Sequence, residues 1–422
     1  MTWNMTNRWW VVFLLVVLVA CNKENDLEIQ EGNQYLTHVI EERKIEKAEL
    51  AAQITDFISG QGINLPEALV LGLLRDIDVA AIEYNTVGAD GSTVTASGVI
   101  AIPSGTISYD HLLSIQHVTL DIDQAPSRQD FYFEMIPVVN GHIVVMADYL
   151  GYGSSQTPDR QHPYLHARLT GTACADMIEA AREYLHDKGI KEETDSLELI
   201  GYSQGGQATI ATVLELERRG KGKSIRAVHA GGGVYDLEET LQTFISPTDV
   251  LDSYSHTGYA PYLIRGMAYG EQLDVQDENL YAPEVISKGL NKMFSTRPLS
   301  EWHQALGTDI TRVMHPDFFA QPSFNGNEDV LASNEDVLAI VEALRTNSLL
   351  NASPQPQTYI HLYHSPKDEQ VPYSNSVNAH SSWPATSLTD LEMSKHGTCG
   401  VEFIMRYMGL WEIFGPLIKA GK

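Results

Sequence analysis

Basic residues are scarce in this sequence. Its 422 residues include 28 Lys and Arg against 55 Asp and Glu, which gives a formal net charge of −27. Such a chain repels phosphate backbones and anionic membrane surfaces on average, so nucleic acid is not an expected partner. Internal repeats and low-complexity tracts are also lacking, while 43% hydrophobic and 20% charged residues are typical of a packed globular protein. The length suits one large domain with an insertion or two modest domains.

Long apolar runs are missing outside the N-terminus, where Trp9 to Ala20 form a stretch too short to span a bilayer comfortably. Arg8 precedes this stretch and Leu-Val-Ala-Cys ends it at Cys21. We therefore expect residues 1–21 to be a targeting signal. It resembles a bacterial lipoprotein signal with its lipobox, which implies a lipidated Cys21 as the mature N-terminus. An ordinary secretory signal cleaved after Ala20 is the alternative.

The segment after Cys21 favours export. Residues 22–26 read Asn-Lys-Glu-Asn-Asp, which looks like the acidic signal that some Gram-negative lineages use to place lipoproteins on the cell surface. The sequence therefore predicts an exported lipoprotein of the outer membrane, with the cell surface as a further expectation. Contact with the membrane is expected through the N-terminal lipid anchor only.

Cysteine is rare as well, with three in the chain. Lipidation of Cys21 would leave Cys174 and Cys399. Whether these two pair cannot be decided from sequence, because a disulfide needs a Cα separation of ~5–6 Å. Export permits the bond, and two small buried residues are an equal alternative.

Strand and helix patterns alternate along most of the chain. Residues 22–62 are charged and helix-prone, which favours a tether and an N-terminal helix. Two alternating runs around the Gly88 to Gly91 turn predict a hairpin over residues 80–102. Further strands are predicted over residues 111–117, 143–147, 197–200, 225–230 and 358–364. Further helices are predicted over residues 129–136, 170–186, 208–219, 330–345 and 400–413.

This alternation predicts an α/β fold with a mostly parallel sheet and helices on both faces. The core is expected to comprise residues 63–235 and 357–422. Residues 236–356 break the rhythm with helical segments separated by loops containing Pro and Gly. We interpret them as a largely helical cap inserted between core strands.

A Gly-x-Ser-x-Gly pattern at residues 201–205 contains the candidate nucleophile, Ser203. A strand pattern precedes it and a helix pattern follows it, as at the sharp strand-to-helix turn that exposes a serine hydroxyl. Gly201 and Gly205 leave room for that turn, and Gly206 allows the helix to pack close to the strand.

A serine hydroxyl needs a histidine base, and the base needs a carboxylate that fixes its tautomer. In this architecture the partners follow the serine in the order acid, then histidine, in loops after strands. Asp368 follows the predicted strand 358–364 and is the candidate acid, with its neighbour Glu369 as the alternative. His396, just before the last helix, is the candidate base.

Two backbone donors must face the oxygen that becomes negative during acyl transfer. One is expected to be the amide of Gln204, directly after the nucleophile. For the other we predict Thr119, in the loop after the strand 111–117. Val118 stands where many hydrolases have glycine, so a different local backbone is expected there.

With these residues placed, the chain resembles the secretory lipase family of α/β-hydrolases, typified by fungal lipase A and its bacterial esterase relatives. The likeness spans residues 75–415 and rests on ordered motifs: Ser97–Ile100, Asp148–Gly153, His162–Ala167, the Ser203 elbow, Gly233–Leu237, the Asp368 loop and His396-Gly397. The resemblance implies an α/β-hydrolase fold and a carboxylic-ester hydrolase that uses Ser203, Asp368 and His396. It also implies a cap over the acyl pocket, with Asp148 and Tyr149 bordering the site.

The expected reaction is hydrolysis of a small-molecule or lipid ester through an acyl-enzyme on Ser203, without a cofactor. Metal binding is not expected, because Pro163 between His162 and His166 argues against a regular helix that would pair them. Three alternatives remain: a peptidase, a polysaccharide deacylase or feruloyl esterase on the same fold, or a surface lipoprotein that binds without turnover.

Overall fold

The computed structural model describes residues 33–60, 67–156, 161–245, 253–295, 299–320 and 334–420. Cys21, and with it the whole predicted targeting signal, lies outside the described residues. Tyr35–Lys422 form one compact unit.

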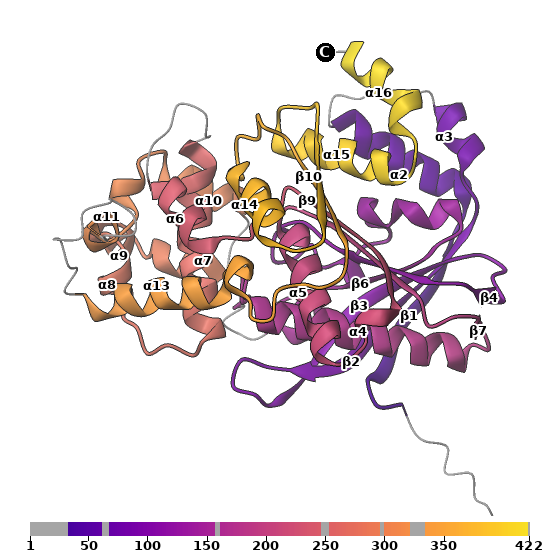
Figure 1. Cartoon of the computed structure of the whole chain (residues 1–422), viewed down its shortest axis with the longest axis horizontal. Coiled ribbons are helices and arrows are strands. Elements are labelled where there is room, and N and C mark those ends of the chain that lie inside the picture. The colour runs from indigo at the N-terminus through magenta and orange to yellow at the C-terminus, as the bar shows by residue number, and fades with distance from the viewer. Residues whose placement is uncertain are drawn as a thin grey trace, which may run out of the picture. The chain divides into compact units, whose positions relative to one another are not determined.

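Within the described ranges, nine strands form one sheet in the order β1-β2-β3-β6-β5-β8-β9-β10-β11 (Figure 1). The pairings from β1 to β6 are antiparallel, and those from β6 to β11 are parallel. The strands are β1 (Leu36–Ile45), β2 (Ile77–Val87), β3 (Thr93–Pro103), β5 (Leu112–Gln116), β6 (Ile143–Ala147), β8 (Leu197–Tyr202), β9 (Ile225–Gly231), β10 (Ile360–His364) and β11 (Thr386–Asp390). A separate pair joins β4 (Ser108–Tyr109) to β7 (Lys191–Glu192).

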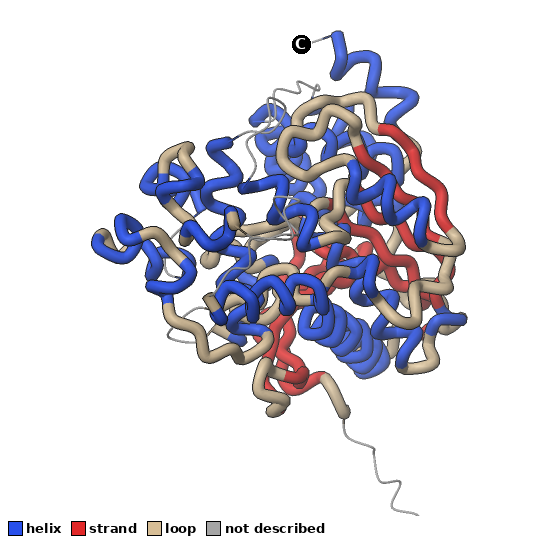
Figure 2. The backbone as a smooth tube through the Cα atoms, turned by 60° about the vertical axis from the view of Figure 1, so that its left-hand side comes forward, coloured by secondary structure: helices blue, strands red, loops and turns tan. Residues whose placement is uncertain are grey.

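Helices cover both faces of the sheet, as Figure 2 shows. One face packs on α4 (Ala167–Asp187), α5 (Gln204–Arg218) and α14 (Ser374–Ser382). The other packs on α2 (Lys47–Gly60), α3 (Glu67–Leu73), η2 (Phe133–Asn140), α15 (His396–Tyr407) and α16 (Trp411–Ala420). Alternate strand residues serve the two cores: Ile82 belongs to the first and Val79 to the second. The mostly parallel sheet between two helical layers confirms the predicted fold class.

Between β9 and β10 the described chain forms a helical layer with its own apolar core (left side of Figure 1). Its helices are α6 (Leu237–Ile245), α7 (Ser253–Gly270), α8 (Asp277–Leu280), α9 (Pro283–Ser287), α10 (Leu299–Leu306), α11 (Pro316–Phe319) and α13 (Glu335–Asn347). Short 3-10 turns join them: η5 (Leu290–Ser295) and η6 (Ile310–Arg312). The described part of residues 236–356 is largely helical, and the cap with these bounds stays a prediction.

The predicted N-terminal helix is present as α2, but residues 36–45, expected to be part of a tether, form the strand β1. This strand pairs with β2 along its whole length, and the Glu183 carboxylate accepts the Leu36 amide at 2.7 Å. Glu and Lys favour helices in isolation, but backbone pairing at a sheet edge overrides that preference. Charged side chains are common on edge strands, where they discourage further pairing.

Two predicted helices also differ. Residues 129–132 are not helical, and the following turn, η2, is a 3-10 helix that contains Pro137. The predicted helix 400–413 is two helices, α15 and α16, separated near Gly409, whose φ is +70°. Pro137 removes a backbone donor from this turn, and a glycine in the left-handed region ends an α-helix.

Candidate active site

Ser203 sits at a strained turn between β8 and α5. Its φ of 59° and ψ of −123° lie outside the regions that non-glycine residues favour. The turn requires close backbone approach: a Cβ on Gly205 would lie 1.9 Å from the carbonyl oxygen of Gln116. The Ser203 amide donates to the carbonyl of Gly231 at 2.8 Å, which fixes the apex against β9. The predicted elbow geometry is therefore present.

A continuous hydrogen-bonded chain joins the three predicted residues. Ser203 Oγ lies 2.8 Å from His396 Nε2, and His396 Nδ1 lies 2.7 Å from Asp368 Oδ2. A carboxylate only accepts, so Nδ1 carries a proton and Nε2 of the neutral ring is left to accept from the serine hydroxyl. Asp368 and His396 follow Ser203 by 165 and 193 positions in the sequence, and folding brings the three residues into one chain of contacts.

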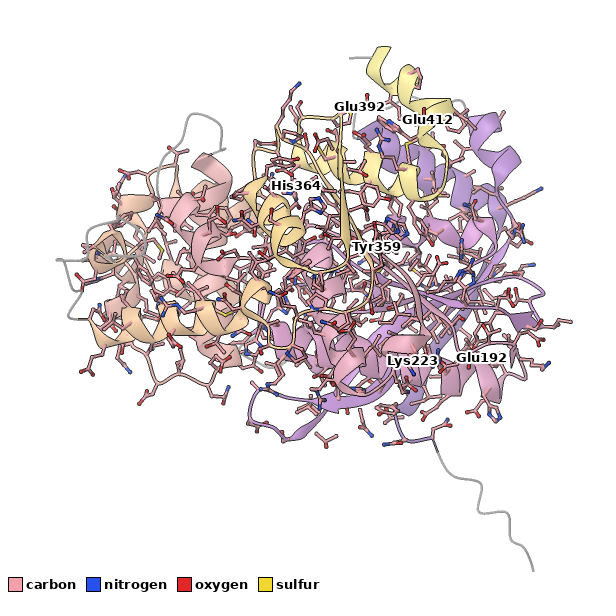
Figure 3. All side chains as sticks on the ribbon, in the orientation of Figure 1. Glu192, Lys223, Tyr359, His364, Glu392 and Glu412 are labelled. Atoms are coloured by element: carbon pink, nitrogen blue, oxygen red, sulfur yellow. The ribbon has the colours of Figure 1, made fainter. Side chains whose placement is uncertain are left out.

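Asp368 is held as an anion. Its Oδ1 accepts the amides of Gln370 and Val371 at 2.9 and 3.0 Å. Burial alone raises the pKa of Asp368, but the imidazoles of His396 and His364 outweigh it and hold the pKa well below its usual range. His364, the last residue of β10 and labelled in Figure 3, has its Nε2 3.4 Å from Oδ2.

Glu369, the alternative acid, has a different position. Its Oε2 accepts the backbone amide of His396 at 2.9 Å, at the N-terminus of α15. An acidic group is favourable there because the first amides of a helix lack partners within it. The structure therefore places Asp368 at the imidazole and Glu369 at the backbone behind it.

The predicted oxyanion residues flank Ser203. Gln204 is the first residue of α5, and Thr119 lines the same cavity as Ser203. The Thr119 hydroxyl lies 2.9 Å from the Tyr164 hydroxyl. The Val118 amide is occupied, since it donates to Glu134 Oε2 at 3.1 Å.

The loop that carries Thr119 rests on buried aromatic groups. The Tyr149 hydroxyl donates to the His117 carbonyl at 3.0 Å, and the two rings stack with centroids 3.9 Å apart. Tyr149 itself has a φ of +66°. Asp148 is buried and accepts the Ser127 amide at 2.8 Å. These two residues support the loop from behind, whereas the resemblance implied that they border the site.

The cavity at Ser203 has a volume of about 280 Å³. Most of its walls come from the core, including Phe133 and Glu134 of η2, and Phe403 and Ile404 of α15. Glu134 is half-buried there, and desolvation raises its pKa from 4.5 to about 8. From the helical layer between β9 and β10, Tyr259 lines the cavity.

The structure also shows the surroundings of the two histidines considered as a metal pair and of the two cysteines. His162 Nδ1 lies 2.6 Å from the Leu150 carbonyl and its Nε2 lies 2.8 Å from Gln204 Nε2, so it supports the residue after the nucleophile. His166 caps the N-terminus of α4. Cys174 and Cys399 are both buried and free, which answers the question that sequence left open.

Sequence reasoning missed several groups that support the site. Tyr202 donates its hydroxyl to Asp368 Oδ2 at 3.4 Å and places its ring beside that of His396. Its position inside the elbow pattern was the available signal. His364 and Glu134 gave no comparable signal, because each acts on a segment that is distant until the chain folds.

Comparisons with known proteins report on the fold and the family of this chain. The sequence profile of the secretory lipase family matches residues 119–405. No curated protein matches the sequence. Among solved structures, one from Legionella pneumophila is 22% identical with a TM-score of 0.72, covering 90% of this chain and 99% of its own. The rice cell wall degrading esterase LipA from Xanthomonas oryzae is 22% identical with a TM-score of 0.67, covering 91% and 99%.

The fungal lipase A of Candida antarctica, in its closed state, is 16% identical with a TM-score of 0.58 and covers 88% of this chain and 82% of its own. Identities this low establish the shared fold, and the profile match over most of the chain establishes the family. The chain belongs to the secretory lipase family and is a carboxylic-ester hydrolase with an α/β-hydrolase fold.

Proposed function

We propose that this hydrolase works through an acyl-enzyme formed on Ser203. The observation that carries the proposal is the unbroken hydrogen-bonded chain from Ser203 through His396 to Asp368. In the first step Ser203 Oγ attacks the ester carbonyl while His396 Nε2 takes its proton. His396 then gives this proton to the departing alcohol, and water activated by the same imidazole cleaves the acyl-enzyme.

Asp368 stabilises the imidazolium that forms in each step. Its low pKa keeps Asp368 ionised at neutral pH. The Gln204 amide and a donor at Thr119 would hold the oxyanion, and loss of one such donor typically costs about 10²–10³-fold in rate. Support for Thr119 over Val118 is the bond that commits the Val118 amide to Glu134.

The cavity favours esters with a modest apolar group. A volume of about 280 Å³ is at the small end of ligand sites. The proposed cap, residues 236–356, would cover the mouth of the cavity through Tyr259, while the core residues of η2 and α15 would contact the substrate's apolar part.

The test is a panel of p-nitrophenyl esters with graded acyl length, measured on wild type and Ser203→Ala. The variant should lose at least ~10⁴-fold in kcat/KM, and Ser381→Ala, which alters an exposed serine of α14, should retain wild-type turnover. A folded Ser203→Ala protein with wild-type turnover would contradict the assignment. Labelling by a fluorophosphonate probe distinguishes an enzyme from a non-catalytic binding lipoprotein.

A second candidate is an ester linked to a polysaccharide, favoured by the similarity to an esterase described as degrading rice cell walls. The chemistry at Ser203 would be the same, and the alcohol or acyl part would differ. Rates on acetylated and feruloylated sugars relative to simple esters separate the two. An aminoacyl amide in the same series tests the peptidase alternative.

We also propose export and lipidation at Cys21. The family is one of secretory enzymes, and the segment ending at Cys21 reads as a lipobox. Within the described ranges, no helix combines the length and the apolarity needed to cross a bilayer. Palmitate labelling of the wild type in a bacterial host, lost in Cys21→Ser, is the expected result; equal labelling of both would overturn the proposal.

A further inference from the structure

A second cluster of metal-ligating side chains lies at the N-terminal ends of three central strands, and Ser203 lies beyond the C-terminal end of one of them. It consists of His111 just before β5, His142 just before β6, and Glu198 in β8. These strands are parallel. Their N-terminal ends therefore lie together on one side of the sheet, and their C-terminal ends, including the Ser203 elbow, lie together on the opposite side. Glu198 precedes Ser203 by five residues of strand, which is about 16 Å.

Strand register brings the three side chains together. Leu112 is opposite Ile143 and Leu113 is opposite Glu198 in the paired strands. His111 and His142 therefore stand side by side one residue earlier, and alternation places His111 on the face of Leu113. Glu198 is part of the paired ladder, and His111 and His142 each directly precede a paired strand residue, so the sheet restricts where the three side chains can lie.

The ligand atoms are close enough for one metal ion. His111 Nε2 lies 3.1 Å from His142 Nδ1 and 3.8 Å from Glu198 Oε1, and the three ligand atoms all lie within 4.8 Å of one another. Tetrahedral zinc with ligands at ~2.0–2.1 Å separates its ligand atoms by about 3.3 Å. The Tyr407 hydroxyl donates to Glu198 Oε2 at 2.8 Å, a contact that orients the carboxylate from outside the ligand set.

We propose that His111, His142 and Glu198 bind a zinc ion, with water as the fourth ligand. Two imidazoles and one carboxylate suit zinc and other late divalent transition metals, whereas magnesium and calcium prefer all-oxygen sites. The ion would join the starts of three strands and thereby stabilise the fold. It would not take part in ester hydrolysis, since it lies at the opposite end of the strands from Ser203.

The Arg226 guanidinium contacts two of the proposed zinc ligands and would compete with the metal ion for them. Its Nε lies 3.4 Å from Glu198 Oε1, and its guanidinium lies 3.2 Å from His111 Nδ1. Zinc binding requires this guanidinium to turn away and the His111 proton to move from Nε2 to Nδ1. The Arg226 side chain is 57% exposed, so water can solvate it after the turn. Removal of the guanidinium is therefore expected to strengthen zinc binding.

Residues 111, 142 and 198 are far apart in the sequence, and no metal site was expected from them. Strand pairing alone brings them together. The cluster therefore differs from His162 and His166, which were considered as a pair and have other partners.

The experiment is zinc titration of the untagged full chain after chelator treatment and dialysis, followed by calorimetry and thermal melting. Wild type should bind one zinc ion at the cluster and melt at a higher temperature with zinc than without it. His142→Ala should lose that binding, and Tyr407→Phe should weaken it by about 10-fold or more. Arg226→Gln should bind more tightly. His186→Ala, whose side chain is 90% exposed, is the matched control and should behave as wild type.

Wild-type zinc affinity in His142→Ala, or no zinc binding to the wild type, would overturn the proposal. Hydrolysis of a p-nitrophenyl ester by each variant shows that it is folded, because the cluster is remote from Ser203. If His142→Ala fails to fold, Glu198→Gln provides the same test with an isosteric side chain. Anomalous diffraction at the zinc edge then locates the ion directly: a peak elsewhere rejects the assignment.

Discussion

At the scale of single residues, two adjacent carboxylates have separate tasks. Asp368 contacts the imidazole of His396, and Glu369 contacts its backbone amide. Asp368→Asn should lower kcat by about 10⁴-fold, because an amide at this position no longer fixes the required tautomer. Glu369→Gln keeps an oxygen acceptor for the amide and should cost less than ~10-fold.

Steady-state kinetics of the two purified variants on one ester measures this contrast. Thermal melting of both variants is the control for folding. Equal losses in the two variants, or a larger loss in Glu369→Gln, would show that the acid has been assigned to the wrong residue.

Glu134 predicts a dependence of stability on pH. Burial raises the pKa of Glu134 from 4.5 to about 8, so between these values the folded protein binds a proton that the unfolded chain releases. The free energy of unfolding contributed by this group is fully present below pH 4.5 and is lost as pH rises through about 8. The neutral Glu134→Gln side chain should remove this loss.

Urea unfolding of wild type and Glu134→Gln at several pH values between 5 and 8 measures the effect. The difference in midpoint should move in favour of the variant as pH rises. Glu278→Gln, at an exposed position of α8, serves as the control. A difference that stays constant with pH would contradict the burial of Glu134 as an acid.

At the scale of elements, the Ser203 elbow depends on contact between backbones. A Cβ on Gly205 would lie 1.9 Å from the Gln116 carbonyl oxygen, so Gly205→Ala must displace α5 or the end of β5. We expect loss of most activity and a lower melting temperature. Gly72→Ala in α3 meets no atom within 4 Å and should be neutral or stabilising by up to ~1 kcal/mol. Circular dichroism melts and ester turnover compare the two.

The sequence predicted elements well where apolar periodicity dominates. Strand β6 has the bounds expected from its uninterrupted apolar run. Edge strands β1 and β11 were not expected, because their charged and polar residues resemble helix or loop composition and only pairing with a neighbour makes them strands. The 3-10 turn η2 was missed for a related reason, since its form depends on packing around Pro137.

In the candidate site, too, residues in local sequence patterns could be predicted, whereas contacts between distant segments could not. Ser203 could be predicted because the elbow is a local pattern, and Asp368 and His396 because chain order restricts the search. The contact of Tyr202 with Asp368 joins positions 166 residues apart, and that of Glu134 with Val118 joins η2 to the loop after β5. Such contacts belong to the folded chain and leave no local signature.

At the scale of the whole compact unit, the apolar core that borders the substrate cavity is separate from the core that holds the helical layer between β9 and β10 together. The cavity at Ser203 borders the core beneath η2 and α15, because Ile404 belongs to that core and Phe133 packs against it. The helical layer between β9 and β10 has a different core, centred on residues such as Phe318. Acyl-chain preference should therefore depend on the first core and be insensitive to the second.

Phe133→Ala and Phe318→Ala test this division. Phe133 lines the cavity, so its truncation should widen the cavity and shift the optimum of the ester panel toward longer acyl chains. Phe318 is fully buried in α11, so its truncation should cost about 3–5 kcal/mol of unfolding free energy while the optimum stays in place. The ratio of kcat/KM between a long and a short ester is independent of the fraction of folded enzyme. A change of that ratio in Phe318→Ala, with none in Phe133→Ala, would mean that the cap rather than the core selects the acyl chain.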